Sequence, residues 1–579
     1  MDVRQRARAA LQRGDWEAAL SSFSELLAQA PGDAEALMCC GVIYGRKGDL
    51  PTASGFLRRA ADAAPNAPDV HINLSKLAIE QRDWREAEQS ARRAAALSPA
   101  NAIAYENLVV ALKHQGRWED ADAALQEGLR QSPGRSNLFN LLGELRQRCG
   151  DIGGAMAAFA QAPPTPANIS CWVASHNYAD GLTPQQLFAV HKTGGARLEA
   201  AVTALPPPAP PRQGRLRVGY VSPDLRDHSV AFFIEPVLKA HNRAAVEIYC
   251  YSTASRPDHV TQRLAKCADH WRDCAALTDQ ALAQQVRSDG IDLLIDLAGH
   301  TVGNRLAAFA MRPAPLQATW IGYPNTTGLA AMDFRLTDAI SDPPGAEALH
   351  TERLIRLPHG FLCYQPPDDA PPPRPPQAGA VTFASFNAVP KYSDDCIAAW
   401  SAILRRLPAA RLRLKSADLA NALARRRVLG RFAAHGVADD RVVLLPLIAD
   451  RREHLTAYGE VDIALDSFPY NGTTTTCEAL FMGVPVLSLR GTSHAGRTGA
   501  SLLTQLGLES LIAGSIEAYV EAAVAMAAPD NPWRQAGRRT ELRERMTASP
   551  LCRPDVFVPD LERAYREMAA IRRAEIGGR

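Results

Sequence analysis

The 579-residue sequence predicts an α-helical solenoid followed by two α/β lobes with parallel sheets. Three observations lead to this fold class: an early repeat, two later series of short strands alternating with helical segments, and proline-rich stretches between the series. We expect a solenoid at 1–162, connector helices and a proline-rich linker at 163–214, a first lobe at 215–365, a second linker at 366–379, and a second lobe with a C-terminal helix at 380–579.

The first quarter of the chain carries a repeat with a period of 34 residues. Four columns share it: the prolines Pro31, Pro65, Pro99 and Pro133; the alanines Ala19, Ala53, Ala87, Ala121 and Ala155; the large apolar residues Trp16, Leu50, Trp84, Trp118 and Ile152; and the glycines Gly14, Gly48, Gly116 and Gly150. Arg82 is the exception in the glycine column. The pattern predicts two helices per unit, because alanine permits close approach, glycine suits the turn and proline ends the second helix.

The second unit resembles the tetratricopeptide repeat, at Leu37, Gly41, Tyr44, Ala53, Leu57, Ala60 and Pro65. Repeats of this family stack into a solenoid whose concave groove commonly holds an extended polypeptide. The resemblance therefore implies polypeptide acceptors in the groove. The alternative is that the repeats only build a homo-oligomer or stiffen the protein.

Composition excludes several classes of partner. The 64 basic and 62 acidic residues give a net charge of +2, so there is no global electrostatic reason to bind nucleic acid or an anionic membrane. The start of the chain lacks an apolar signal region, and no later run reaches the ~18 apolar residues of a membrane span. Eleven scattered cysteines without a C-x-x-C pattern favour reduced thiols and a cytoplasmic protein.

Each predicted lobe contains strands that alternate with helical segments. The first series comprises 216–222, 246–252, 292–298 and 318–323, and the second comprises 381–386, 411–414, 441–445, 462–466 and 484–489. Two parallel sheets of this kind place a cleft between the carboxyl ends of their strands. Nucleotide-sugar transferases, epimerases and two-lobed binding proteins all use this plan, so the motifs must decide among them.

The most informative motif is the segment from Asp466 to Glu478, which leaves a buried strand, turns at Asn471-Gly472 and enters a helix at 477–482. Thr475 and Glu478 have the spacing of a capping box. A polar turn that opens a helix offers free backbone N–H groups and the positive end of the helix dipole, which suit a diphosphate. The alternative is a well-capped helix without a ligand.

Two further side chains fall at the same edge of the second lobe. Lys391 follows the first strand of this lobe, and a lysine there can neutralise phosphate oxygens. His454 falls near the start of another helix, where its ring could stack on a nucleobase. Taken singly, each residue could also be an ordinary surface or capping side chain.

In the first lobe, Asp224, Asp227 and His228 follow the strand at 216–222. Carboxylates and an imidazole at the end of a strand can orient or deprotonate a hydroxyl. The alternative is that both aspartates cap the next helix and His228 covers its end. The sequence lacks the P-loop motif G-x-x-x-x-G-K-[ST], the nucleophile elbow G-x-S-x-G and the zinc-protease motif H-E-x-x-H. It also suggests no divalent metal site.

Together these features resemble the O-linked N-acetylglucosamine transferase family, in which tetratricopeptide repeats precede a two-lobed glycosyltransferase of the GT-B type. The most specific segments are 216–228, 312–324 and 471–476. The short linker at 366–379 stands where animal members carry a large inserted domain, so the chain is similar to compact bacterial members.

The resemblance implies the donor-site residues. Ile321 and Gly322 would border the sugar pocket, Lys391 would contact the diphosphate, Thr474 and Thr475 would bind phosphate, His454 would lie against the uridine, and Arg451 and Glu478 would contact the ribose. Thr473 and Ala388 replace a His and a Gln of the animal donor site. These replacements leave the identity of the donor sugar open.

The implied activity is an inverting, metal-independent transfer of N-acetylglucosamine from UDP-N-acetylglucosamine to Ser or Thr hydroxyls, with no cofactor besides the donor. His228 or Asp224 would orient or deprotonate the acceptor, although a phosphate oxygen of the donor could take the proton instead. Two alternatives remain: an epimerase of the same fold, and a repeat scaffold with inactive lobes.

Overall fold

The computed structural model describes residues 2–134, 136–376, 379–535 and 537–577. The described residues form two compact units: one comprises those within 1–146, 157–163 and 421–423, and the other comprises the rest of them. We describe each unit by itself. Among the described residues, no helix combines the length and apolar character that crossing a bilayer requires.

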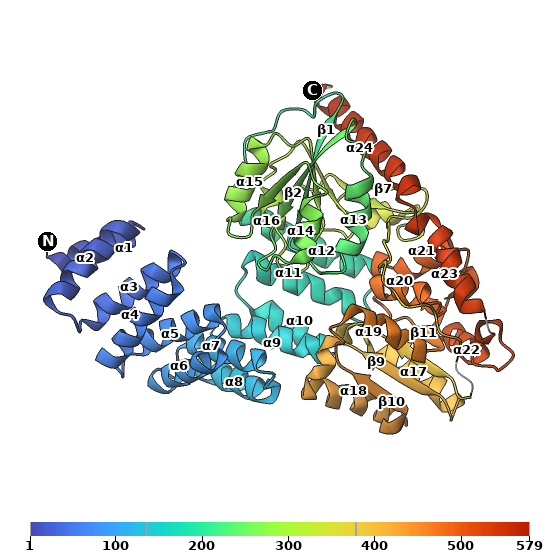
Figure 1. Cartoon of the computed structure of the whole chain (residues 1–579), viewed down its shortest axis with the longest axis horizontal. Coiled ribbons are helices and arrows are strands. Elements are labelled where there is room, and N and C mark those ends of the chain that lie inside the picture. The colour runs from blue at the N-terminus through green and yellow to red at the C-terminus, as the bar shows by residue number, and fades with distance from the viewer. Residues whose placement is uncertain (1, 135, 377–378, 536, 578–579) are drawn as a thin grey trace. The chain divides into compact units, whose positions relative to one another are not determined.

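The N-terminal part consists of helices only (Figure 1). Their bounds are α1 (Val3–Gln12), α2 (Trp16–Gln29), α3 (Ala34–Arg46), α4 (Leu50–Ala63), α5 (Pro68–Gln81), α6 (Trp84–Leu97), α7 (Ala102–His114), α8 (Trp118–Gln131), α9 (Asn137–Arg148) and α10 (Ile152–Gln161). The predicted helix pairs of the repeat are confirmed.

The repeat columns have the local roles that the period predicts. All five alanines of the column are fully buried. The four glycines adopt left-handed backbone with φ between +73° and +83°. Arg82 has φ +60° at the same point of its unit, so the turn forces a left-handed conformation there even without glycine.

The connector contains α11 (Pro166–Ser175), the 3₁₀ turn η1 (His176–Tyr178) and α12 (Pro184–Ala200). Thr183 caps α12 through a capping box with Gln186.

The first lobe has a seven-stranded parallel sheet in the order β3-β2-β1-β4-β5-β6-β7. Its strands are β1 (Leu216–Ser222), β2 (Val246–Ser252), β3 (His270–Asp273), β4 (Leu293–Asp296), β5 (Leu316–Thr319), β6 (Phe334–Thr337) and β7 (Arg353–Arg356). The associated helices are α13 (Ala231–Ala240), α14 (His259–Ala265), α15 (Asp279–Ser288), α16 (Leu306–Ala310) and η2 (Ala346–Leu349).

The second lobe has a six-stranded parallel sheet in the order β10-β9-β8-β11-β12-β13. Its strands are β8 (Thr382–Ser385), β9 (Arg411–Lys415), β10 (Val442–Leu445), β11 (Ile463–Leu465), β12 (Val486–Leu489) and β13 (Ile512–Ala513). Its helices are α17 (Asp394–Arg406), α18 (Ala422–Ala434), α19 (Arg451–Thr456), α20 (Thr474–Phe481), α21 (Thr498–Gln505), α22 (Ile516–Met526) and α23 (Arg538–Ala548). Short 3₁₀ turns are η3 (Val389–Lys391), η4 (Ala417–Ala420), η5 (Asp439–Arg441), η6 (Ala457–Glu460), η7 (His494–Gly496), η8 (Glu509–Leu511), η9 (Pro532–Arg534) and η10 (Pro550–Cys552).

The predicted strand at 318–323 is partly wrong. The observed strand β5 ends at Thr319, because Ile321 takes a left-handed conformation with φ +61° that no strand can contain. Four further strands, β3, β6, β7 and β13, were not predicted.

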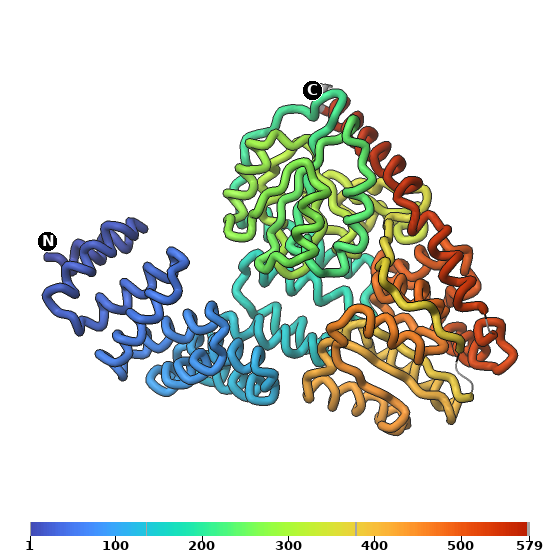
Figure 2. The backbone as a smooth tube through the Cα atoms, viewed as in Figure 1, coloured from blue at the N-terminus to red at the C-terminus, as the bar shows by residue number. Residues whose placement is uncertain are grey.

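The last helix, α24 (Pro554–Gly577), begins in the second lobe and returns to the first (Figure 2). The Phe557 ring stacks on Trp320 at 6.0 Å between centroids, and the hydroxyl groups of Tyr565 and Tyr220 lie 2.7 Å apart. The final helix therefore completes the core of the first lobe.

Candidate functional site

The loop after β11 is organised by Asp466, a buried carboxylate. Its Oδ1 accepts hydrogen bonds from the backbone N–H groups of Ser467 at 2.9 Å and Gly472 at 2.6 Å, and its Oδ2 accepts one from Ser488 Oγ at 2.7 Å. Burial raises the pKa of Asp466 to about 6, against the opposing effect of these hydrogen bonds and of Lys391. Asp466 thus holds the turn that leads into α20.

The helix α20 begins at Thr474, directly after this turn. Thr473 stands at its N-cap but makes no side-chain capping bond. The first N–H groups of a helix have no partner within it, so this start can receive an anion.

The predicted capping box between Thr475 and Glu478 is wrong. Thr475 lies inside the helix and its Oγ1 donates to Asn387 Oδ1 at 2.8 Å, while Glu478 faces His454. Both side chains therefore hydrogen-bond to residues that are distant in the sequence, not to each other's backbone. A Cβ on Gly472 would lie 2.5 Å from Thr475 Oγ1 and 2.9 Å from Asn387 Oδ1, so the close approach requires glycine.

Lys391 lies beside this turn, in η3. Its Nζ donates to the carbonyl oxygen of Asn471 at 2.7 Å and lies 4.0 Å from the centroid of the Tyr470 ring. Tyr470 in turn stacks on Tyr178 of the connector, with centroids 5.1 Å apart. Burial lowers the pKa of Lys391 to about 8, and Asp466 opposes the shift.

His454 and Glu478 form a hydrogen-bonded pair, with 2.8 Å between His454 Nε2 and Glu478 Oε2. Lys415 Nζ lies 2.6 Å from the other ring nitrogen, Nδ1. The sequence analysis missed Lys415, because a single lysine at the end of a strand has no distinctive pattern. The ring of Phe386 lies 4.7 Å from that of Tyr458, and both rings line a small cavity of about 20 Å³ with Asn387, Asp466 and Thr475.

Arg451 begins α19 and reaches across to the first lobe. Its guanidinium carbon lies 3.5 Å from the centroid of the Phe232 ring in α13. Its Nε and Nη2 are buried and have no hydrogen-bond partner among the described residues.

In the first lobe, Ile321 and Gly322 form a strained turn after β5. Ile321 has φ +61°, which is uncommon for a β-branched residue, and a Cβ on Gly322 would overlap the carbonyl oxygen of Leu297. The hydroxyl of the following Tyr323 is held by Asn177 Nδ2 at 2.6 Å and His191 Nε2 at 2.7 Å, both from the connector. The connector therefore supports this turn.

Asp224 and His228 lie together after β1. His228 Nδ1 is 3.6 Å from Asp224 Oδ1 and accepts a hydrogen bond from Val230 N–H at 3.3 Å. Burial raises the pKa of Asp224 and lowers that of His228. The alternative that the aspartates cap α13 is wrong, since its N-cap, Val230, makes no side-chain capping bond. The backbone N–H of Asp227 instead donates to Asp258 Oδ2 at 2.8 Å.

The second-lobe residues thus gather at one place: Lys391 and Thr473–Thr475 around the turn, and His454 with Glu478 beside the same helix. Asp224 and His228 form a separate group in the first lobe. Among the described residues, no hydrogen bond or ion pair joins these two side chains to Lys391.

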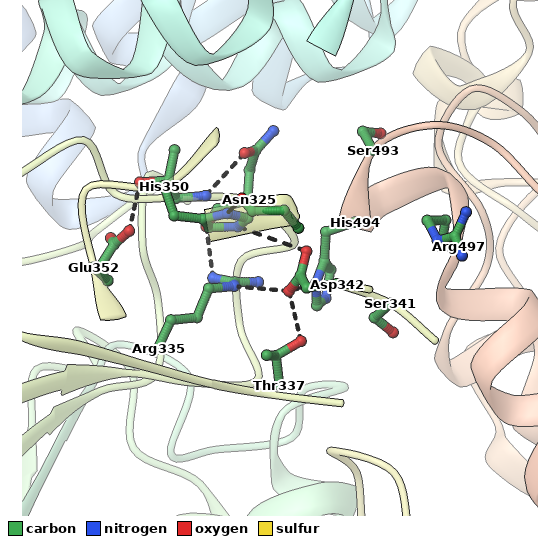
Figure 3. A network of polar contacts seen from close by, with 12 residues as sticks. Asn325, Arg335, Thr337, Ser341, Asp342, His350, Glu352, Ser493, His494 and Arg497 are labelled. Atoms are coloured by element: carbon green, nitrogen blue, oxygen red, sulfur yellow. Dashed lines mark hydrogen bonds and ion pairs between the residues drawn. The ribbon is translucent and has the colours of Figure 1, made fainter. Parts of the chain in front are cut away.

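A buried polar network joins the two lobes (Figure 3). Asp342 Oδ2 accepts hydrogen bonds from Thr337 Oγ1 at 2.5 Å and from His494 Nδ1 at 2.8 Å, and Arg335 Nε lies 3.7 Å away. Despite burial, His494 and Arg335 hold the pKa of Asp342 well below its ordinary value. Because Asp342 belongs to the first lobe and His494 to the second, the network fixes one lobe against the other.

Comparison with known proteins agrees with this arrangement. Residues 4–68 and 78–145 match tetratricopeptide repeats. The chain is 40% identical over 402 residues, 68% of its length, to the probable UDP-N-acetylglucosamine–peptide N-acetylglucosaminyltransferase SPINDLY of Arabidopsis thaliana, and 33% identical over 367 residues, 61% of its length, to the probable enzyme SEC of that plant. It spans only 44% and 37% of these relatives.

A mutant O-GlcNAc transferase of Thermobaculum terrenum has a similar structure, with a TM-score of 0.67 and 33% identity over 98% of this chain and 97% of that one. This similarity supports the observed order of domains, in which helical repeats precede two parallel-sheet lobes in a GT-B-like arrangement. Residues 201–365 and 375–561 match the glycosyl transferase family 41, and the chain belongs to this family.

Proposed function

We propose that the chain transfers N-acetylglucosamine from UDP-N-acetylglucosamine to Ser or Thr hydroxyls of polypeptides, with inversion at the sugar carbon and without a metal. The observation that carries the proposal is the juxtaposition of Lys391 with the uncapped start of α20. Both place positive charge where a diphosphate leaving group needs it, and the family membership supports a nucleotide-sugar donor.

Lys391 has the capacity for this role. An ammonium group has three hydrogens, and one of them is used by the Asn471 carbonyl, so the others are available to phosphate oxygens. The free N–H groups at Thr474 and Thr475 would bind the same diphosphate. His454 would lie against the uridine, and Arg451 and Glu478 would bind the ribose.

Inversion requires the acceptor oxygen to attack the sugar carbon on the face opposite the departing diphosphate. The new C–O bond forms as the bond to the UDP oxygen breaks, and the hydroxyl proton passes to a base. His228 Nδ1 accepts from Val230, which leaves the proton of the neutral ring on Nε2 and suits His228 to orienting the hydroxyl. Asp224, whose pKa is raised by burial, is then the better side-chain base, and a donor phosphate oxygen is the other candidate.

The strained turn at Ile321 and Gly322 would form the wall of the sugar pocket. The solenoid groove would guide the acceptor polypeptide, as in other tetratricopeptide solenoids. A cytoplasmic location is part of this proposal, supported by eleven scattered cysteines without a C-x-x-C pattern.

The experiment is incubation of the full chain with labelled UDP-N-acetylglucosamine and a cell extract, followed by mass spectrometry. We expect sugar on Ser or Thr of proteins, and no transfer by Lys391→Ala. Release of a free altered UDP-sugar would instead identify an epimerase. Absence of UDP binding at millimolar concentration, measured by calorimetry, would favour a scaffold with inactive lobes.

A further inference from the structure

Lys415 is a buried lysine at the carboxyl end of the second sheet. It is the last residue of β9, which pairs with β8 on one side and β10 on the other. The residue is 5% exposed. A lysine is rarely buried to this extent without a partner, so its contacts define what it does.

The partner is His454, and the contact determines the protonation of the ring. Lys415 Nζ donates to His454 Nδ1 over 2.6 Å, because an ammonium group can only donate. His454 Nε2 donates in turn to Glu478 Oε2 over 2.8 Å, because a carboxylate can only accept. His454 is therefore neutral with its proton on Nε2.

The surroundings hold the lysine in this position. Its Nζ lies 5.0 Å from the centroid of the Phe386 ring, and this ring packs 6.2 Å from that of His454. Burial lowers the pKa of Lys415 to about 8, and Glu478 opposes the shift. Within the described part of the chain, Lys415 thus interacts with His454 by a hydrogen bond and with Glu478 by its charge.

We propose that Lys415 is a positioning residue of the nucleotide-sugar site, holding His454 in one tautomer and one ring orientation. The inference rests on the proposed function, in which His454 lies against the base and Glu478 binds the ribose. Without Lys415, Nδ1 loses its donor, and the ring is free to change tautomer and turn away from Glu478.

The expected consequence is a loss of donor binding rather than of chemistry. We expect Lys415→Met to weaken UDP binding by about 10- to 100-fold, the range for a lost hydrogen bond to a charged group. The KM for the donor should rise more than kcat falls. This pattern contrasts with Lys391, whose loss should lower kcat as well as donor affinity.

The experiment combines histidine NMR with calorimetry on the full chain. Long-range ¹H–¹⁵N spectra of ¹⁵N-histidine protein report the tautomer, and His454→Gln identifies the signals. We expect wild-type His454 to carry its proton on Nε2, because the Lys415 ammonium donates to Nδ1 over 2.6 Å. In Lys415→Met the ring should lose this single tautomer.

Two further variants sharpen the result. Lys415→Gln keeps an N–H donor without the charge, so it should restore the tautomer and part of the UDP affinity. Lys239→Met removes a surface lysine of α13 and should change neither. Lys415→Gln also covers the case in which Lys415→Met fails to fold.

Each outcome is decisive. An unchanged His454 tautomer in folded Lys415→Met, with UDP still bound by the wild type, would overturn the inference and leave the proposed function standing. A changed tautomer with unchanged UDP affinity would reduce Lys415 to a structural contact and would also overturn it. If the wild type fails to bind UDP, the result contradicts the proposed function, and the positioning role of Lys415 is overturned together with it.

Discussion

The guanidinium carbon of Arg451 lies 3.5 Å from the centroid of the Phe232 ring, so a cation of the second lobe rests on an aromatic ring of the first. Nε and Nη2 of this arginine are buried without a hydrogen-bond partner among the described residues. The Phe232 ring fixes the plane of the guanidinium, and the unpaired N–H donors of Arg451 are available to ligand oxygens. Arg451 is thus preorganised by the opposite lobe.

Phe232→Leu should lower UDP affinity by about 10-fold, because a cation–π contact is worth about 0.5–2 kcal/mol and its loss frees the arginine. Calorimetric titration measures the effect. The matched control is Trp533→Leu, which removes another ring that lies 5.3 Å from the guanidinium carbon of Arg538 and should not change UDP binding. Equal affinities of the wild type and Phe232→Leu would show that the stack does not prepare Arg451 for the donor.

Lys391→Ala should reduce transfer by at least about 10²–10³-fold with the fold intact, because it removes the charge that stabilises the leaving diphosphate. Single-turnover assays at saturating donor isolate this effect from binding. Lys239→Ala, a surface lysine of the first lobe, serves as control. Near-normal turnover in folded Lys391→Ala would refute the leaving-group role.

The pH dependence of UDP binding should follow from the same lysine. A diphosphate binds the protonated form, and the pKa of Lys391 is lowered to about 8, so affinity should be steady below pH 8 and decline as pH rises above it. Lys415, with its pKa also lowered to about 8, contributes in the same direction. Calorimetry across this range should show a smaller decline in Lys391→Ala than in Lys239→Ala, and an identical decline in both would exclude Lys391 as its source.

His228→Ala should slow transfer by about 10²-fold, within the range for a lost acid–base or orienting group, and leave UDP binding almost unchanged. The exposed His259 of the same lobe provides the control variant, His259→Ala. Comparing initial rates with UDP affinity separates the two effects. A large loss of UDP affinity would move His228 into the donor site.

Gly322→Ala should abolish transfer, because the added Cβ overlaps the Leu297 carbonyl oxygen and displaces the strained turn beside Ile321. Gly430→Ala is the control, since a Cβ there meets open space within α18 and should be neutral or slightly stabilising. Transfer rates and thermal unfolding of both variants give the comparison. An active Gly322→Ala protein would show that the turn lies outside the sugar pocket.

Asp342→Asn should destabilise the contact between the lobes by about 3–5 kcal/mol, because it leaves Arg335 and His494 without their buried carboxylate. Its pKa is depressed in the folded state, so its stabilising effect is present above the ordinary value near 4 and declines as pH falls below it. Urea unfolding at neutral and acidic pH measures both effects. Glu521→Gln, which breaks an exposed ion pair with Arg406, should change little, and an equally small effect of Asp342→Asn would contradict the role of the network.

Sequence patterns predicted the elements that are long or strongly periodic. The strands at 216–222 and 246–252 are confirmed at both ends, and the repeat columns correspond to buried alanines and left-handed turns. The strand β3, with the polar and partly exposed sequence His-Trp-Arg-Asp, has no hydrophobic pattern and was missed.

The candidate site was predictable only where one motif held several residues together. Thr474 and Thr475 were found through their segment, but Asn387, which accepts the Thr475 hydroxyl, lies 88 residues away along the chain. Lys415 and His454 are separated by 39 residues and meet only because β9 and α19 are neighbours in the folded lobe. The capping box failed for the same reason, since distant partners outcompeted a local bond.

The return of α24 to the first lobe affects how the chain matures during synthesis. Tyr220 and Tyr565 touch across 345 residues of sequence, and His241 pairs with Glu562 of the same helix at 3.0 Å. A nascent first lobe therefore presents an unfilled face until α24 has also left the ribosome. Premature termination after β7 but before residue 554 would release a first lobe lacking this cover, a natural substrate for chaperones and proteases.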